Sequence, residues 1–589
     1  MSQLIQKPIK KFHTITDFLM HKNGAVYTPQ TLADYLAQKT VQYILDDPDF
    51  KVSKISIVDP ACGEGILLDS VTRLLMSKKR KRRVTVCGID VDQNAIMLCK
   101  KRLGQTFREK ISLSTIHTNA LCPYGVSTLD KGLKQIFDEA SIDNGFDVLI
   151  ANPPWGADIS RYKTKLDTQQ YFTLKGQVDS FELFVELATK LVKKGGYFAF
   201  IVPDSILNHG KSILRDKLIE STEIKFVARL GEKIFPEIFR ACVLIVCKNS
   251  IPSVNNLVDC FRLSSSKRNM ILDGQLTFID VEKTLAHKVP QNRFANNPYK
   301  QFDIDLRQNE TTLLDKLRRK TVLGNVLTST RGIELGSSGT ICSCNQCGIW
   351  TPLSEKKSIK CKNCGKNYDP QKSKIIKIST KKRLVNSVPL ITGKDLKRYT
   401  CIPTSRIILG KNGINYKPRS IYESPKILIR KTGVGLTAAL DYTSSHTTQV
   451  VYILRNKEKT NRNLEFFIAL INSRLYYFFL VKSFGELEWR SHPYLTQSQI
   501  LSLPLPDLQS EKNKKIMNRV VSLLKPILKK GKPPKHIDLE IELLIGSLFG
   551  LTKNDYKIMF DTINESDDLL PVRDLKNFGL EEILDKLDR

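Results

Sequence analysis

The sequence predicts an α/β fold with a mostly parallel sheet over residues 1–250, and two observations carry that prediction. Short apolar, β-branched segments alternate with amphipathic helical segments from residue 54 onward, and "KISIVD", "FDVLIA" and "YFAFIVP" are nearly continuous apolar runs. Strands of a parallel sheet covered on both faces have this composition. Several of these strands also end on a small polar residue, and ligands of such sheets bind at the carboxyl ends of the strands.

The elements follow from the same alternation. We expect strands over residues 54–59, 84–90, 111–117, 146–152, 197–203, 223–229 and 241–248. Apolar residues at helical spacing predict a helix from Glu64, a second over 92–103 and a third over 180–194. The last of these strands closes the first domain near residue 250.

Beyond residue 250 the pattern changes. A chain of 589 residues is too long for one ordinary core, so we expect further domains. Poor periodicity predicts a connecting region over 251–319, short strands predict a mixed α+β domain over 320–507, and the remainder, 508–589, is expected to be helical. The apolar helix expected over 464–482 is predicted to be buried in a hydrophobic core.

The charge balance points to a polyanionic partner. The net charge is +32, and the isoelectric point is near 9.5. Nucleic acid is the leading candidate for this partner, ahead of an anionic membrane surface. The alternative without any partner is that the chain belongs to a proteome generally rich in lysine. No run of eighteen apolar residues occurs and the first residues lack a secretory signal, so we expect a cytoplasmic protein without a membrane partner.

Four polar residues end successive expected strands: Asp59, Asp90, Asn119 in a turn, and Asn152. The first of them lies in "VDPACGEG", which predicts a glycine-containing turn before a helix. Such a turn lets the backbone come close to a ligand, but it also occurs as a simple tight turn without a ligand. The turn lacks both the GxGxxG spacing and the Walker lysine. Asp90 is at the distance expected of a ribose-binding acid, although either Asp90 or Asp92 could instead cap the following helix.

These segments occur in a recognisable order. "VYTPQTLADYL", "VDPACGEG", "GIDVDQNA", "TNALCP", "FDVLIANPPWG", "SFELFVELATKLVKKGGYFAFIVP" and "RLGEKIFPEIFRACVLIVCK" follow one another through residues 25–248. The chain thereby resembles DNA adenine-N6 methyltransferases of the TaqI-like gamma class of restriction-modification systems. The resemblance implies a Rossmann-like S-adenosylmethionine-dependent catalytic domain over 1–250 and a target-recognition domain over 320–507.

The resemblance also implies roles for individual residues. Thr28 would contact the methionine portion of S-adenosylmethionine, and Asp90 and Val91 would hold the ribose and the adenine face. The cofactor's turn would be lined by Asp59, Ala61 and Gly63. Asn119 would meet the cofactor's adenine amine, where family members more often have Asp.

"NPPW" suits an amine substrate. The side-chain oxygen of Asn152 and the carbonyl of Pro153 would accept hydrogen bonds from an adenine amine, while Pro153 and Pro154 restrict the backbone. An adenine in duplex DNA must be rotated out before it can react. Trp155, which we expect outside the core, and Phe235 would then form two stacking faces, although core packing is the alternative for Phe235.

A cysteine cluster lies in the second half. Cys344/Cys347 and Cys361/Cys364 form two Cys-x-x-Cys-Gly units, which predict a structural zinc ion in a ribbon over 342–365. Cys342 is a less well spaced additional candidate. The ribbon is expected to clip a loop of the recognition domain and to present lysines to DNA.

The second half also resembles the TaqI-like specificity domain in "RGIELGSSG", "ITGKDLKRY" and "SPKILIRKTGVGLTAALDY". Arg430, Lys431 and the turn of Gly433 and Gly435 are candidates for phosphate or base contacts, with a solvated basic face as the alternative. Double-stranded DNA is therefore the expected partner. A separate restriction endonuclease is a further partner that the resemblance allows.

Other functions remain open. Cytosine-N4 methylation usually has Ser in place of Asn152, and cytosine-C5 methylation needs a Pro-Cys nucleophile that the sequence lacks. A combined restriction and methylation protein is disfavoured because only 25 residues precede "VYTP". Protein glutamine N5-methylation uses a similar grip on an amide and lacks a reason for the basic second half. Intact Asn152 and "DPACGEG" argue against a non-catalytic DNA-binding module.

Overall fold

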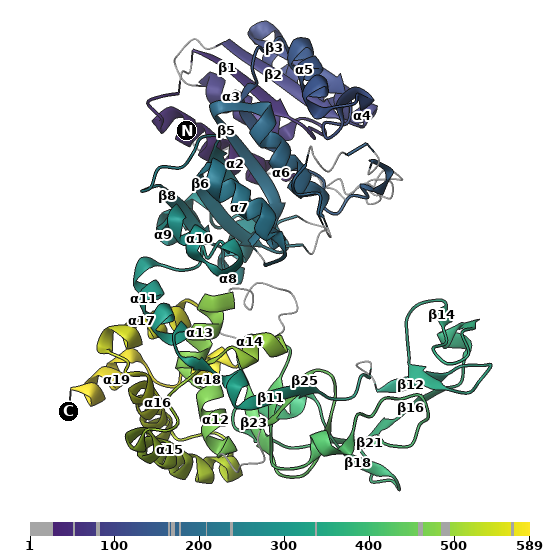
Figure 1. Ribbon diagram of the computed structural model, residues 1–589, viewed down its shortest axis with the longest axis vertical. Coiled ribbons are helices and arrows are strands. Elements are labelled where there is room, and N and C mark those ends of the chain that lie inside the picture. Colours follow the sequence, from purple (N-terminus) through teal and green to yellow (C-terminus); the bar gives the residue numbers. More distant parts are fainter. Residues whose placement is uncertain are drawn as a thin grey trace. The chain divides into compact units, whose positions relative to one another are not determined.

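The computed structural model divides into two compact units, residues 1–307 and 308–589 (Figure 1). It describes residues 28–588 apart from 51–52, 78–82, 163–164, 167–170, 176–177, 208, 236–239, 336–338, 458–462, 485–494 and 567–569. The N-terminal stretch read above for a secretory signal lies outside the described residues.

Unit 1 is built on a mixed, mostly parallel sheet. Its order is β3-β2-β1-β4-β5-β7-β6-β8-β9, in which β7 is antiparallel to both β5 and β6. The strands are β1 (Lys54–Asp59), β2 (Arg83–Asp90), β3 (Ile111–His117), β4 (Phe146–Ala151), β5 (Val192–Pro203), β6 (Glu223–Gly231), β7 (Cys242–Lys248), β8 (Leu257–Arg262) and β9 (His287–Pro290). The expected α/β sheet is confirmed, with every strand expected before residue 250.

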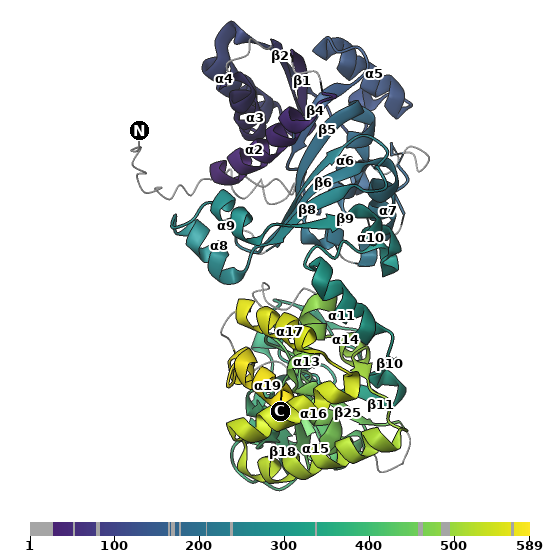
Figure 2. The same cartoon turned by 90° about the vertical axis from the view of Figure 1, so that its left-hand side faces the viewer.

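Helices cover both faces of this sheet (Figure 2). One face carries α2 (Gln30–Asp46), α3 (Ile66–Ser77) and α4 (Gln93–Phe107), and the other carries α5 (Leu129–Ala140), α6 (Ser180–Leu191) and α7 (Ser212–Ser221). Strand β4 is buried at every position, as a central strand covered on both sides must be. A capping box of Asp179 and Glu182 starts α6.

Residues 251–307 differ from the expected connecting region. They add β8 and β9 to the sheet, together with the short helices α8 (Ser265–Leu272), α9 (Phe278–Leu285) and α10 (Gln291–Asn296). Helix α9 packs on α2, where the rings of Tyr35 and Phe278 stack at 5.1 Å. These elements are four to eight residues long, which is too short for a clear hydrophobic period.

Unit 2 begins as a strand-rich domain. One sheet has the order β11-β25-β22-β23 and a second the order β17-β21-β18-β24. Their strands are β11 (Leu327–Arg331), β25 (Val451–Asn456), β22 (Lys426–Arg430), β23 (Ala438–Asp441), β17 (Ser379–Thr380), β21 (Ser405–Ile408), β18 (Ser387–Ile391) and β24 (His446–Thr447).

An insertion, which we call the cysteine ribbon (residues 340–377), extends from these sheets (Figure 1). It consists of a three-stranded sheet and a two-stranded hairpin, with β12 at the centre of the former. Its strands are β12 (Thr340–Ser343), β13 (Trp350–Pro352), β14 (Ile359–Lys360), β15 (Asn367–Tyr368) and β16 (Ile375–Lys377).

Helices complete unit 2. They are α11 (Gln308–Arg318), α12 (Leu464–Ile471), α13 (Arg474–Phe484), α14 (Gln497–Leu501), α15 (Glu511–Lys530), α16 (Lys535–Phe549), α17 (Lys553–Glu565), α18 (Val572–Leu575) and α19 (Leu580–Leu587). The single helix expected over 464–482 is broken at Asn472 into α12 and α13, which are buried as expected. Among the described helices, none alone is long and apolar enough to span a membrane, and α12 with α13 meets that test only as a pair bent by 57°.

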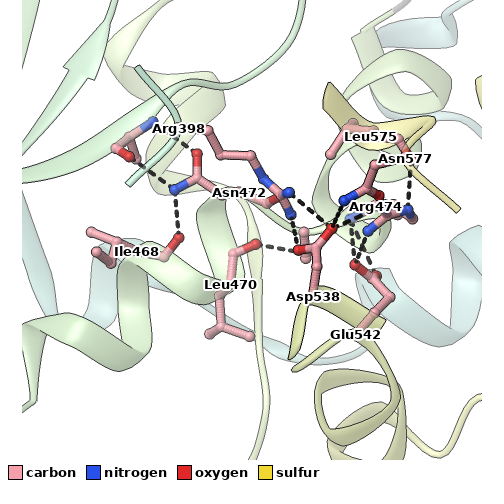
Figure 3. Close-up of polar contacts among 11 residues, drawn as sticks. Arg398, Ile468, Leu470, Asn472, Arg474, Asp538, Glu542, Leu575 and Asn577 are labelled. Carbon is pink, nitrogen blue, oxygen red and sulfur yellow. Dashed lines mark hydrogen bonds and ion pairs between the residues drawn. The ribbon is translucent and has the colours of Figure 1, made fainter. Parts of the chain in front are cut away.

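A buried polar cluster joins the strand-rich domain to the C-terminal helices (Figure 3). Asp538 of α16 pairs with Arg398 at 2.8 Å and with Arg474 at 3.2 Å, and Arg474 also pairs with Glu542 at 3.1 Å. Burial alone would raise the pKa of Asp538, but the two guanidinium groups lower it to about 2. The break at Asn472 places Arg474 at the start of α13, where it reaches both carboxylates.

Candidate functional site

The polar strand ends lie together at one edge of unit 1. Strands β1 and β4 are parallel neighbours, and β2 lies on the far side of β1 in the same direction. From β1 the chain adds β2 and β3 on one side, and then β4 and β5 on the other side, so the order of the strands reverses between β1 and β4. Asp59, Asp90, Asn119 and Asn152 therefore all follow the carboxyl ends of neighbouring strands at the switch point, where open α/β sheets bind ligands.

The glycine turn after β1 is tied to β2. Asp59 accepts a hydrogen bond from the amide of Ala61 at 3.0 Å, and Gly63 donates its amide to Asp90 Oδ2 at 2.8 Å. Gly63 has a φ of +50°, and a Cβ built there would meet nothing within 4 Å. The turn thus leaves open space above its backbone, beside two carboxylates.

The structure separates the roles of the two acids after β2. Asp92 caps α4 by accepting from the amide of Asn94 at 2.9 Å, whereas Asp90 accepts from the amides of Gly63 and Asp92. Val91 between them is 57% exposed. An exposed apolar face next to a carboxylate fits a nucleoside, because the ribose offers hydroxyl donors and the base offers a flat surface.

The pKa values of the buried Asp59 and the half-buried Asp90 are both raised. Burial raises the pKa of Asp59 well above its ordinary value, and the nearby Asp90 adds to the effect. Burial also raises the pKa of Asp90, against which the amides of Asp92 and Gly63 act. A hydrogen-bond donor bound to either carboxylate would lower its pKa.

Asn119 follows β3. Its Oδ1 accepts from the amide of Leu121 at 3.0 Å, which orients the side chain within its own loop. A carbonyl oxygen has two lone pairs, so the contact with an amine that the resemblance implies fits this orientation.

Asn152 is held by a residue distant in sequence. Its Nδ2 donates to the hydroxyl of Thr28 at 3.0 Å, although the two are 124 positions apart. In this orientation Oδ1 is the amide atom able to accept from an amine. Pro153 is buried beside it.

The loop after Asn152 is fixed to the start of α6. The hydroxyl of Ser180 donates to the carbonyl of Pro154 at 2.5 Å, and the amide of Gly156 donates to Asp179 at 2.6 Å. Arg240 pairs with the same Asp179 at 2.5 Å. Sequence reasoning missed these supports, although the capping-box spacing at Asp179 was a usable signal.

The two aromatic residues are not arranged as expected. Trp155 is 6% exposed and Phe235 2%, so the expectation that Trp155 lies outside the core is wrong. Their rings meet edge to face, with centroids 5.3 Å apart and planes at 87°. They do not form two facing surfaces in this structure, because each ring fills the space beside the other. Among the described residues, no acceptor lies within hydrogen-bond distance of the buried Trp155 Nε1.

The cysteines of the ribbon do converge. The sulfur atoms of Cys344, Cys347, Cys361 and Cys364 all lie within 4.8 Å of one another. The cross pairs are 3.7 and 3.6 Å apart, close to the ~3.8 Å separation of thiolates around tetrahedral zinc. Cys342 is outside this group, because its sulfur lies beside Thr351 and Tyr368.

The two Cys-x-x-Cys-Gly units, here called knuckles, have matching backbone conformations. Gly348 donates its amide to the carbonyl of Cys344 at 2.9 Å, and Gly365 donates to that of Cys361 at 3.0 Å. Both glycines have positive φ, +69° and +74°. These turns direct backbone amides toward the sulfur atoms, as four-thiolate metal sites require.

The basic turn that follows β22 is tightly built. Lys431 donates its amide to Val450 and accepts from Leu495, which fixes the chain after β22. Gly433 lies against the guanidinium of Arg430, and a Cβ at Gly435 would meet the ring of Tyr477 at 3.0 Å. A positive φ of +109° accounts for Gly433, and a positive φ of +75° together with close packing accounts for Gly435, which leaves the DNA contacts of Arg430 and Lys431 as predictions.

Comparison with known families confirms the resemblance. Residues 85–235 match the model of the Eco57I restriction-modification methylase, and residues 388–505 match that of the TaqI-like C-terminal specificity domain. The chain thus carries an Eco57I-type methylase segment followed by a TaqI-like specificity domain.

Individual proteins are similar over parts of the chain. The type II methyltransferase M.BanIII of Aneurinibacillus aneurinilyticus is 31% identical over 230 residues, 37% of each chain. M.VspI of Vibrio sp. (strain 343) is 21% identical over 350 residues, 58% of this chain and 71% of the relative. The match thus spans little more than a third of the length of the first relative. The solved type IIL restriction-modification enzyme MmeI in complex with DNA has a TM-score of 0.49 and 11% identity, over 94% of this chain and 75% of that one.

Proposed function

We propose that this chain, which joins an Eco57I-type methylase segment to a TaqI-like specificity domain, transfers a methyl group from S-adenosylmethionine to the N6 amine of an adenine rotated out of duplex DNA. The observation that carries the proposal is the side-chain amide of Asn152, which Thr28 holds at the same edge of the sheet as Asp90 and the exposed Val91. The setting would be a restriction-modification system.

The residues present fit the cofactor. Asp90 would accept from the ribose hydroxyls, Val91 would cover the adenine face, and the open space over Gly63 would admit the remaining, methionine portion of the cofactor. Asp59, Ala61, Asn119 and Thr28 complete the set that the resemblance implies. When bound, S-adenosylmethionine supplies an electrophilic methyl group on a sulfonium sulfur.

The protein's own task is to prepare the amine. The lone pair of adenine N6 is delocalised into the ring, so the nitrogen is a poor nucleophile. Hydrogen bonds from that amine to Asn152 Oδ1 and the Pro153 carbonyl favour a pyramidal nitrogen and stabilise the positive charge that develops on it. The bonds from Ser180 and to Asp179 keep these acceptors from relaxing away.

Binding of the base requires a local rearrangement. Trp155 and Phe235 contact each other edge to face, so a base stacked between them needs the rings to separate. The buried indole N–H of Trp155 has no acceptor among the described residues, which lowers the cost of moving that ring. Stacking of a base on an aromatic ring stabilises by ~1–3 kcal/mol and offsets part of the unstacking cost.

Zinc is a second part of the proposal. Cys344, Cys347, Cys361 and Cys364 would hold one structural zinc ion, because four thiolates leave no open coordination position for catalysis. Metal analysis of the purified full chain should find one zinc per chain. Cys361→Ser should lose the metal, whereas Cys342→Ser should retain it.

The test of the methyl transfer is direct. The chain is expressed in a host free of DNA methylation, and the host DNA is sequenced for modified bases. A repeated sequence motif carrying N6-methyladenine is the expected result, and Asn152→Ala should remove the mark while the purified variant still binds S-adenosylmethionine. N4-methylcytosine at the motif, or a mark that persists in Asn152→Ala, would contradict the assignment.

A further inference from the structure

The cysteine ribbon carries an exposed concentration of positive charge. Residues 340–377 contain eight lysines against two acids, Glu355 and Asp369. All eight side chains are exposed, and five of them lie within residues 356–366 around the second knuckle. The lysines are Lys356, Lys357, Lys360, Lys362, Lys366, Lys372, Lys374 and Lys377.

These charges have no acidic partner in the described part of the chain. Among the described residues no ion pair involves any of the eight, and the hydrogen bond from Lys366 to the side chain of Gln346 has a neutral acceptor. Elsewhere in unit 2, exposed lysines such as Lys514, Lys535 and Lys553 do pair with acids. The ribbon therefore holds like charges together on its surface, which costs free energy unless a polyanion binds them.

The ribbon cannot hold this surface by packing alone. The group buried around the four converging cysteines consists of Cys342, Cys344, Cys361 and Tyr368 with a few partly buried neighbours, whereas Ile341 at the base packs into the core of the specificity domain. A core of this size does not support a fold without a metal or a disulfide. The four converging thiols are thus the part that keeps the lysines in one arrangement.

The base of the ribbon is attached to the specificity domain. Trp350 donates its amide to the carbonyl of Asn412 at 2.9 Å, and the ammonium of Lys411 lies 5.8 Å from the Trp350 ring. Strand β16 continues directly into β17 of the second sheet, where Ile408 donates its amide to Ile378. An arm with this attachment moves with the domain that is matched to target recognition.

We propose that the cysteine ribbon is a DNA-binding arm whose lysines neutralise backbone phosphates and whose arrangement depends on the bound zinc. The inference rests on duplex DNA as the substrate in the proposed function. Lysine is a compact point charge without the planar fork of arginine, so the arm contributes affinity and little base selection.

The salt dependence of DNA binding measures how many phosphates the cysteine ribbon contacts. The full chain is titrated onto a labelled duplex of random sequence at several salt concentrations, and the slope of log affinity against log salt is taken. Each phosphate contact contributes about 0.9 to the slope, so losing one lowers the affinity roughly eightfold at ~0.1 M salt. We expect a slope smaller by about 1 to 4, and weaker binding, in a variant with four substitutions: Lys356→Gln, Lys357→Gln, Lys360→Gln and Lys362→Gln.

A matched control separates the arm from net charge. The same number of exposed lysines is replaced in the C-terminal helices, by Lys512→Gln, Lys515→Gln, Lys525→Gln and Lys557→Gln. This control should keep a slope close to that of the unmodified chain. An equal drop in both variants, or no drop in the ribbon variant, overturns the proposal.

The metal provides a second measurement. Cys361→Ser should lose zinc and show the same reduced slope as the ribbon variant, whereas Cys342→Ser should keep both. A zinc-free Cys361→Ser protein with an unchanged slope would show that the metal does not organise the arm. The proposal and the proposed function also fail separately. If the chain methylates adenine but the ribbon variant keeps an unchanged salt slope, only the DNA-binding arm is refuted. If the ribbon variant loses slope but the unmodified chain leaves no methyl mark on DNA, only the methyl transfer is refuted.

Discussion

Asn152 donates its side-chain amide to the hydroxyl of Thr28 at 3.0 Å, which ties the loop after β4 to the residues before α2. The two residues were expected to serve different ligands, a cofactor and a base. The bond between them links those tasks, because any displacement of Thr28 also turns the amide that would accept the base.

Removing the Thr28 hydroxyl should slow methyl transfer. Thr28→Val keeps the shape and loses the acceptor, so the amide of Asn152 loses a bond of about 0.5–1.5 kcal/mol. We expect kcat to fall about two- to tenfold, with Thr28→Ser close to the unmodified chain. Single-turnover methylation measures this step. A fall in cofactor affinity without a change in kcat would assign Thr28 to the cofactor alone.

Cofactor affinity should depend on pH through Asp90. The pKa of this carboxyl is raised by burial, and only its ionised form offers two charged oxygens that can accept from both ribose hydroxyls. Affinity should therefore fall as the pH drops through the raised pKa, by up to about tenfold per pH unit below it. Calorimetric titration with S-adenosylmethionine over a pH series measures the effect.

Asp92 offers the control for that series. Asp90→Asn should weaken binding about 10- to 150-fold and flatten the pH dependence, because a charge-assisted bond is replaced by a neutral one. Asp92→Asn keeps a side-chain oxygen to cap α4 and leaves the Asp90 carboxylate in place, so affinity near neutral pH should match that of the unmodified chain, with the pH dependence moved to slightly lower pH because the Asp92 charge raises the pKa of Asp90. Equal losses in both variants would contradict the division of roles between the two acids.

Phe235 should contribute to kcat/KM for DNA and not to the affinity for the cofactor. Phe235→Ala removes one stacking face worth ~1–3 kcal/mol, so kcat/KM for DNA should fall roughly 5- to 150-fold. Trp155→Phe keeps an aromatic face and should retain most activity. Unchanged cofactor binding in both variants shows that unit 1 is folded. Full activity of Phe235→Ala would leave its ring with the packing role alone.

Breaking the buried cluster in unit 2 should destabilise that unit. Asp538→Ala leaves the guanidinium groups of Arg398 and Arg474 without their shared carboxylate, which costs about 3–5 kcal/mol in unfolding free energy. Chemical denaturation of the full chain measures the loss. Arg519→Gln breaks the exposed pair with Glu540 and should cost under about 1 kcal/mol. Similar values for both would mean that the buried cluster adds no more than a surface pair.

Much of the fold could be predicted from the sequence because its signals are local. The apolar runs that became β1 to β7 and the helices between them follow from hydrophobic period. Strands β8 and β9, the last two at one end of the sheet, were missed, since short elements leave a weak hydrophobic period. The break at Asn472 was missed because an apolar run does not reveal where the chain must turn to bring Arg474 to Asp538.

The sequence by itself determined the strand-end residues Asp59, Asp90, Asn119 and Asn152, the two cysteine pairs and the excess of lysine, since residue type and spacing along the chain define them. Only the tertiary structure decided which side chains meet: Thr28 with Asn152, Gly63 with Asp90, and Trp155 with Phe235 edge to face. Such contacts depend on how distant segments pack around one sheet, and packing directions are not encoded in any short stretch of residues.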